Sequence, residues 1–302
     1  MDRNVEIAYK ILKEPIDANM RCPVELLDIA EYTTAEPGEI IKNYTSEDGN
    51  TDDIYTADAA GGLTIHKVSA VAPAQLTFVG LQSKLEYVLI DEINDAEDQN
   101  GLARKKLGII RAMDKMEVKR VLDMILLLST QEVDKDSGGD ILDTIIKMKQ
   151  KVEDYATDYI LLVGATIQSK IDTYDKEHVT TFNYKMNISE ELAKLGIKKV
   201  VKVIGLVNGA SVFSATKAIL VGRNSNLSQG KPITVIRRKF NAKIAAMSGV
   251  EGTPERLVSV AETPTIINAD GLNTLGYGTY GYSKIIECVT DKRAISWSDN
   301  LY

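Results

Sequence analysis

The chain has 302 residues, of which 44% are hydrophobic, enough for one large domain or two smaller ones with a real core. Its formal net charge of −7 argues against a protein that wraps nucleic acid, because neutralising phosphates requires a surplus of Lys and Arg. Its two cysteines have neither disulfide-framework nor metal-site spacing, which suits a reducing compartment, and no apolar run is long enough to cross a membrane.

Residues 1–45 are predicted to form an extended N-terminal arm. Pro15 and Pro23 interrupt the helical pattern, so only short helical turns are expected, near 5–12 and 24–32. Too few apolar residues are present for an independent core. The arm must therefore pack on something else, such as a neighbouring subunit.

Residues 46–85 are predicted to form a long hairpin that leaves the body of the protein and returns. A polar, glycine-ended stretch (SEDGNTDDIYTADAAGG) is followed by two segments with strand-like alternation, LTIHKVSAV and AQLTFVGL. A two-stranded hairpin is marginally stable alone in water, so this one needs a partner surface.

Residues 99–128 form one uninterrupted amphipathic run, preceded by an acidic stretch that suits the start of a helix. Apolar residues recur at spacings of three and four, at Leu102, Ile109, Ile110, Met113, Met116, Val121, Leu122, Ile125 and Leu128. The pattern predicts a helix about 40 Å long, at 1.5 Å per residue. Leu126 and Leu127 lie on the sides of the helix that the apolar stripe leaves uncovered, so we expect the C-terminal end of this helix to be buried on all sides.

The middle of the chain, residues 140–231, alternates helical and strand-like segments and predicts an α/β layer around a central sheet. Residues 232–302 contain strand-like segments, with the glycine-rich TLGYGTYGY interpreted as a loop between two strands. The basic cluster Arg237-Arg238-Lys239 lies on one of these strand-like segments and is expected to pair with an acidic neighbour.

No catalytic, cofactor-binding or metal-binding constellation emerges. The segment from Gly276 to Gly281 matches the dinucleotide pattern GxGxxG, but that fingerprint requires a helix after the glycines, and the residues that follow are strand-like. His66 and His178 have no partners at a usable spacing.

The order of these elements resembles the major capsid protein of tailed bacteriophages, which has the Hong Kong 97 fold. The resemblance rests on the overall order and on three segments: LEYVLIDEIND before the long helix, VEDYATDYILLVGATI, and SATKAILVGR. It implies an α+β fold with an N-terminal arm (1–45), an E-loop hairpin (46–85), a peripheral domain with a spine helix (86–139), an α/β axial domain (140–231) and returning strands that complete both domains (232–302). It also implies a final long strand at about 282–295.

The resemblance implies a shell protein that assembles into hexamers and pentamers and encloses double-stranded DNA in a virion, after assembly in the host cytoplasm. A separate scaffolding protein, or none, and a portal would be its further partners, and no cofactor or membrane is expected. The residues expected at contacts between subunits are Ile65, Lys67, Phe78, Arg237, Arg238, Tyr277 and Tyr280.

Two alternatives remain open at this point. An encapsulin-type nanocompartment would share the fold and enclose protein cargo. A nucleotide-binding enzyme, resting on GYGTYG alone, predicts a strand before Gly276 and a helix after Gly281.

Overall fold

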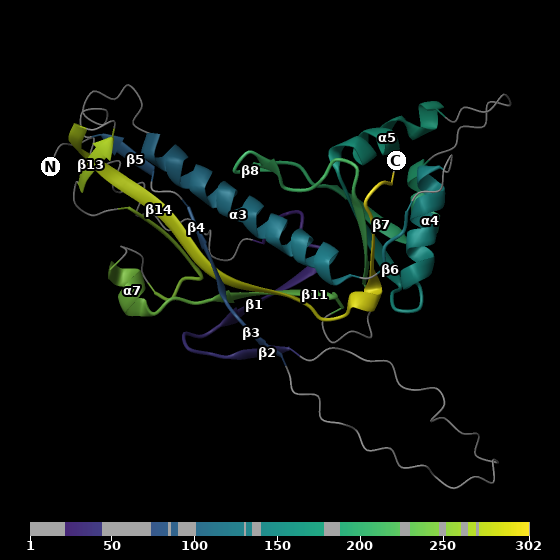
Figure 1. Ribbon diagram of the computed structural model, residues 1–302. Coiled ribbons are helices and arrows are strands. Elements are labelled where there is room, and N and C mark those ends of the chain that lie inside the picture. Colours follow the sequence, from purple (N-terminus) through teal and green to yellow (C-terminus); the bar gives the residue numbers. More distant parts are fainter. Residues whose placement is uncertain are drawn as a thin grey trace, which may run out of the picture.

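A computed structural model shows an elongated α+β molecule with two main sheets (Figure 1). The residues that the structure describes are 22–43, 74–83, 86–89, 101–129, 131–134, 140–177, 188–223, 230–247, 252–260, 265–269 and 272–301. The helical turn expected near 5–12, the acidic stretch before the long helix, and the part of the hairpin that includes Ile65 and Lys67 lie outside the described residues.

The long helix predicted from the apolar stripe is α3 (Gly101–Leu128), and it crosses the molecule diagonally in Figure 1. Its inward face is almost fully buried, with Val121, Leu122 and Ile125 at 0% exposure. Its last turn differs from the prediction, because Leu127 is 83% exposed and Leu128 is 47% exposed. Only one side of this last turn faces the core, so Leu127 and Leu128 stay in contact with solvent.

The larger sheet is organised around one strand of 18 residues, β14 (Leu272–Val289). Its other strands are β1 (Ala30–Ala35), β4 (Val79–Gln82), β5 (Glu86–Leu89), β11 (Ile233–Arg238), β12 (Arg256–Val260) and β13 (Thr265–Ala269). All of them except β1 pair antiparallel with β14.

The strand β14 begins ten residues earlier than the expected final strand, so the prediction of a loop at TLGYGTYGY is wrong. Tyr277 pairs with Val88 and Tyr280 with Ser259, and these long-range pairings extend a segment whose glycines favour a loop locally. The strand also continues past Gly281, where a dinucleotide fingerprint requires a helix. The interpretation of GYGTYG as a nucleotide site is therefore wrong as well.

Part of the predicted arm belongs to the protein's own core. The segment 24–29 forms turns, and β1 then pairs in parallel with β11 along its whole length. Leu26 and Ile29 are 0% exposed and lie in the same apolar cluster as the inward face of α3. This portion of the arm needs no neighbouring subunit to be buried.

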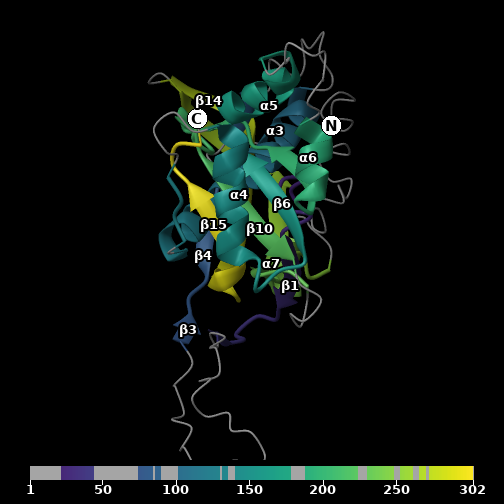
Figure 2. The same cartoon turned by 90° about the vertical axis from the view of Figure 1, so that its right-hand side faces the viewer.

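The middle of the chain folds as its helix–strand alternation predicts, into helices packed on a four-stranded sheet (Figure 2). The sheet has the order β15 (Ile295–Ser298), β10 (Ala218–Arg223), β6 (Asp158–Val163) and β7 (Ile197–Lys202). The helices are α4 (Ile141–Val152), α5 (Ala165–Glu177) and α6 (Ile188–Lys194). The 3₁₀ turn η2 (Lys292–Ala294) leads into β15.

The smaller sheet is buried on both faces, which explains why β6 reads as a continuous apolar run. Leu161 and Val163 belong to the apolar cluster formed with α4, α5 and α6. Ile160 and Leu162 face the opposite way and belong to the cluster formed with α3. The spine helix is thus packed against strands of both sheets, which joins the two parts into one body.

The remaining described elements lie at the periphery. They are the hairpin strands β2 (Ile41–Asn43) and β3 (Ala74–Leu76), the helix α7 (Ala242–Met247), and the small hairpin β8 (Leu206–Val207) with β9 (Ala210–Ser211). The turn of the small hairpin has positive φ at Asn208 (51°) and Gly209 (80°), as a tight two-residue hairpin turn requires.

Gly281 allows the spine to approach β14 closely. A Cβ atom at this position would lie 2.5 Å from the Met113 sulfur and 2.6 Å from Cγ2 of Ile109, both on α3. The last glycine of GYGTYG therefore serves helix–sheet packing.

We expect Gly281→Ala to destabilise the protein by about 1–3 kcal/mol, because the added methyl group overpacks a filled contact. A matched control is Gly108→Ala, since a Cβ there meets nothing within 4 Å and the helix gains up to about 1 kcal/mol. Urea unfolding of both variants is the measurement. Equal stability of the two variants would contradict this account of Gly281.

Candidate functional site

The middle of the spine helix carries a buried carboxylate that links it to three strands. Glu117 is 0% exposed and accepts hydrogen bonds from Arg237 of β11 at 2.9 Å and from Arg256 of β12 at 2.8 Å. It also accepts one from the Tyr32 hydroxyl of β1 at 2.7 Å. A single side chain therefore ties α3 to β1, β11 and β12.

Further acidic and aromatic groups surround the two arginines. Arg256 also donates to Asp114, one turn before Glu117 on the same helix. Arg237 lies 3.7 Å from a Glu255 oxygen, and its guanidinium stands 4.7 Å from the centroid of the Tyr32 ring. The two buried guanidinium groups thus share three carboxylates. A guanidinium group buried without a counter-charge would strongly destabilise the protein.

The electrostatics keep Glu117 ionised. Burial alone would raise the pKa of its carboxyl, but the charges of Arg237 and Arg256, with the hydrogen bonds from Arg237 and Tyr32, hold that pKa below its usual value. Burial and the charge of Glu117 raise the pKa of Tyr32, so its hydroxyl stays a donor. A carboxylate that is inaccessible and has three donors suits anchoring, and it is poorly placed for acid–base chemistry.

The base of the predicted hairpin is formed by two short strands. β2 and β3 pair antiparallel, from Ile41 opposite Leu76 to Asn43 opposite Ala74. They form a two-stranded sheet separate from the two main ones, and both views place β3 at the edge of the body (Figures 1 and 2). The residues between them, 44–73, lie outside the described part.

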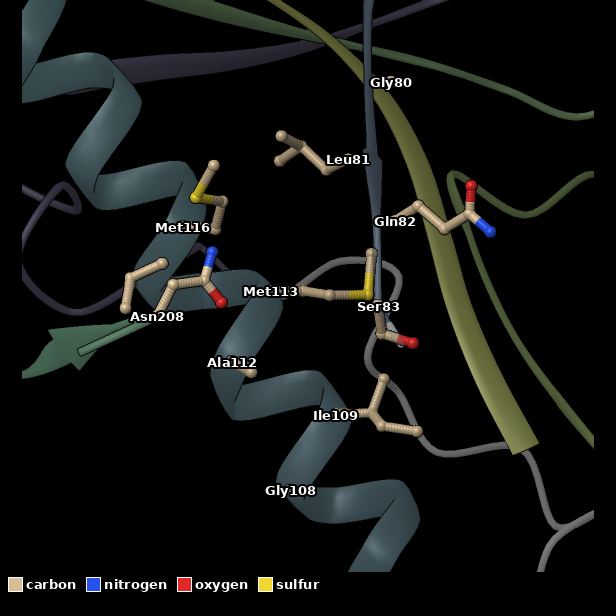
Figure 3. A pocket seen from close by; sticks show the side chains of 11 residues that line it. Gly80, Leu81, Gln82, Ser83, Gly108, Ile109, Ala112, Met113, Met116 and Asn208 are labelled. Atoms are coloured by element: carbon tan, nitrogen blue, oxygen red, sulfur yellow. The ribbon is translucent and has the colours of Figure 1, made fainter. Parts of the chain in front are cut away.

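An open groove of about 800 Å³ runs between α3, β4 and the turn of the small hairpin (Figure 3). Met113 and Met116 line it from the helix, Leu81 lines it from the returning strand, and Asn208 closes one end. Most of its wall is apolar. The groove is therefore a surface suited to packing and offers no cluster of reactive groups among the residues described.

The structure brings together only some of the predicted contact residues. Phe78 and Arg238 meet at the hairpin base, where the guanidinium lies 4.3 Å from the ring centroid. Tyr280 is half-buried on β14 and lies away from that pair along the strand, while Tyr277 is placed only by its backbone pairing with Val88.

The expectation that the basic cluster 237–239 pairs with acidic neighbours is confirmed for Arg237 and Lys239, whereas Arg238 contacts the Glu39 carbonyl and the Phe78 ring. Arg237 binds Glu117, and the Lys239 ammonium lies 2.7 Å from Glu36. Because the Arg237 side chain is 2% exposed and engaged within its own chain, it has no surface for a neighbouring subunit. We therefore drop Arg237 from the predicted subunit contacts.

Sequence reasoning missed Glu117 and Arg256. A signal for Glu117 was present, because it follows Ile110 and Met113 at the spacing of the apolar stripe and precedes Val121 by four residues. A charged residue on a buried stripe needs a buried partner. Nothing local identified Arg256 as that partner, since 139 residues separate the two.

The described residues contain no group of three or more side chains able to hold a metal ion. Within the same part of the chain, no helix is both long enough and apolar enough to span a membrane.

The sequence matches no known family model and no curated protein sequence. Solved structures do match. The virus-like particle of Pyrococcus furiosus has a TM-score of 0.55 at 13% identity, covering 97% of this chain and 98% of that one. A phage-related protein of Bordetella bronchiseptica has a TM-score of 0.53 at 13% identity, and the match covers 98% of this chain and 96% of that one. The satellite phage P4 procapsid has a TM-score of 0.52 at 12% identity, and the match covers 98% of this chain and 90% of that one.

The chain has the Hong Kong 97 capsid fold. The likeness extends along almost the whole chain. At these low identities it is a likeness of fold, and it transfers no residue roles.

We expect Glu117→Gln to lower the free energy of unfolding by about 3–5 kcal/mol, because it leaves two buried guanidinium groups short of a counter-charge. Asp123→Asn on the same helix is the control, since it breaks an exposed pair with Lys119 worth about 0–1 kcal/mol. Denaturant unfolding of the dilute protein measures both. Similar losses in the two variants would contradict the anchoring role.

Acid should weaken this anchor. Because folding lowers the pKa of Glu117, the unfolded chain takes up the proton first, and the stability that this carboxylate contributes is complete above about pH 4.5. It is lost as the pH falls through the lower folded-state value. Unfolding free energies measured across this acid range should fall more steeply in the wild type than in Glu117→Gln. Parallel curves would show that Glu117 is not the group that titrates.

Proposed function

We propose that this chain is the major capsid protein of a tailed bacteriophage, a non-enzymatic subunit that assembles into a closed icosahedral shell. The observation that carries the proposal is the match along 97–98% of the chain to subunits of a virus-like particle and of a phage procapsid. Both are closed assemblies of many copies.

Self-association suits the exposed features of the subunit. The two-stranded hairpin base is marginal alone and gains stability only by packing on another surface. Large apolar side chains are also exposed at Leu127 (83%), Leu206 (65%) and Ile204 (56%). Packing such groups between copies removes them from water, and head-to-tail contacts between identical copies close into rings. Hexamers and pentamers are the rings that we propose.

The enclosed cargo in this proposal is double-stranded DNA, held without specific binding. A formal net charge of −7 opposes tight adhesion to phosphates, which favours packaging and release. Assembly in the host cytoplasm, a separate scaffolding protein and a portal belong to the same proposal, as do subunit contacts through Ile65, Lys67, Phe78, Arg238, Tyr277 and Tyr280.

Electron microscopy of the purified full-length protein is the test, together with ultraviolet absorbance to detect nucleic acid. Closed cages, or rings of five and six copies, support the shell function. Cages that copurify with a second protein inside would instead identify a nanocompartment. A monomer at high concentration with a tightly bound nucleotide would overturn the proposal.

A shortened variant provides the matched control. Replacing residues 44–73 by Asn-Gly joins Asn43 to Ala74, which already face each other, through a turn that suits a two-stranded hairpin. We expect this variant to fold with the wild-type circular dichroism spectrum but to form no cages. Cages of normal size from the shortened variant would remove the hairpin from the assembly mechanism.

A further inference from the structure

Both legs of the hairpin pass the end of the same strand, β11. The outgoing leg, residues 36–40, connects β1 to β2, and the returning leg, residues 77–78, connects β3 to β4. β11 ends at Arg238 and is followed by Lys239. Two basic side chains therefore stand where the hairpin joins the body.

Arg238 contacts both legs with one side chain. Its Nη2 atom donates a hydrogen bond to the carbonyl oxygen of Glu39 on the outgoing leg, at 2.9 Å. The same guanidinium lies 4.3 Å from the centroid of the Phe78 ring on the returning leg, within the range of a cation–π contact. The planar guanidinium is suited to both tasks at once, because it stacks with its face and donates from its edge.

Lys239 and the local turn support the outgoing leg. The Lys239 ammonium lies 2.7 Å from a Glu36 carboxylate oxygen. The backbone N–H of Lys239 donates a hydrogen bond to the Ala35 carbonyl oxygen at 2.9 Å. The backbone N–H of Glu36 donates to the Glu39 carboxylate at 2.9 Å, and that of Glu39 donates to the Glu36 carbonyl at 3.1 Å. The Glu39 carbonyl that Arg238 binds thus belongs to an ordered turn.

The hairpin base has little else to orient it. Within the described residues, β2 and β3 pair only with each other, through three residue pairs. No ladder of hydrogen bonds joins them to either main sheet in that part of the chain. The direction in which the two strands leave the body therefore depends on side-chain contacts at the two legs.

We propose that Arg238 is the positioning residue of the hairpin, clamping its outgoing leg through the Glu39 carbonyl and its returning leg through the Phe78 ring. The clamp is a property of the single subunit. Its consequence for assembly, that a released hairpin meets neighbouring copies less efficiently, rests on the proposed shell function.

The test is hydrogen–deuterium exchange of the full-length protein, kept dilute enough to remain unassembled. Arg238→Ala should raise amide exchange rates about fivefold in peptides covering 36–43 and 74–79, the factor expected from losing one cation–π contact. Exchange in the spine helix should not change. Lys243→Ala is the control, since it removes the same charge from an exposed position on α7 and should change neither region.

A double-mutant cycle separates clamping from general stability. Phe78→Leu keeps an apolar side chain but removes the ring, so it should raise exchange at the same peptides, and adding Arg238→Ala to it should have a smaller further effect. Arg238→Lys keeps the charge but loses the planar fork, and should restore protection only in part. Additive effects of the two substitutions, unchanged exchange in Arg238→Ala, or a rise that includes the spine would overturn the clamp.

Microscopy of the same variants keeps the two proposals apart. Cages from the wild type, with unchanged exchange in Arg238→Ala, would overturn the clamp and leave the shell function standing. Local loss of protection in Arg238→Ala, with a wild type that stays monomeric at high concentration and holds a tightly bound nucleotide, would support the clamp and overturn the shell function.

Discussion

The arrangement of the chain depends on one buried interaction, the carboxylate of Glu117 between the guanidinium groups of Arg237 and Arg256. An apolar stripe is enough to press a helix against a sheet, but it allows sliding and rotation because dispersion contacts have little directionality. Hydrogen bonds between ionised groups have fixed lengths and angles, and breaking them inside the protein is costly. The spine is therefore held in one register against three strands.

That register connects the two parts of the molecule. The apolar cluster around the spine contains Val235 of the larger sheet and both Ile219 and Ile295 of the smaller one. The chain itself also joins them, since β14 crosses the larger sheet and β15 completes the smaller. Within the described residues the hairpin base pairs with neither main sheet, and Arg238 and Phe78 meet where its two legs join this body.

The glycines of GYGTYG show how a motif takes its meaning from its surroundings. The same glycine pattern binds phosphate groups in proteins where a helix follows the glycines. Here they lie within an 18-residue strand, and Gly281 accommodates the side chains of Ile109 and Met113 from the spine. Close packing of a helix on a strand and close approach of a phosphate both require an absent side chain, so the sequence pattern alone does not separate them.

Local periodicity determined the spine helix, the helix–strand alternation of the middle region and the strands at the hairpin base, because helices and amphipathic strands carry their repeats within a few residues. The run of charges also led to the expectation that the basic cluster 237–239 pairs with an acidic neighbour. Only the tertiary structure decided that β1 joins the main sheet, that β14 begins at Leu272, and that Glu117 receives Arg256. Each of these depends on pairing between residues far apart in the chain, and such pairing leaves no repeat in the sequence on either side.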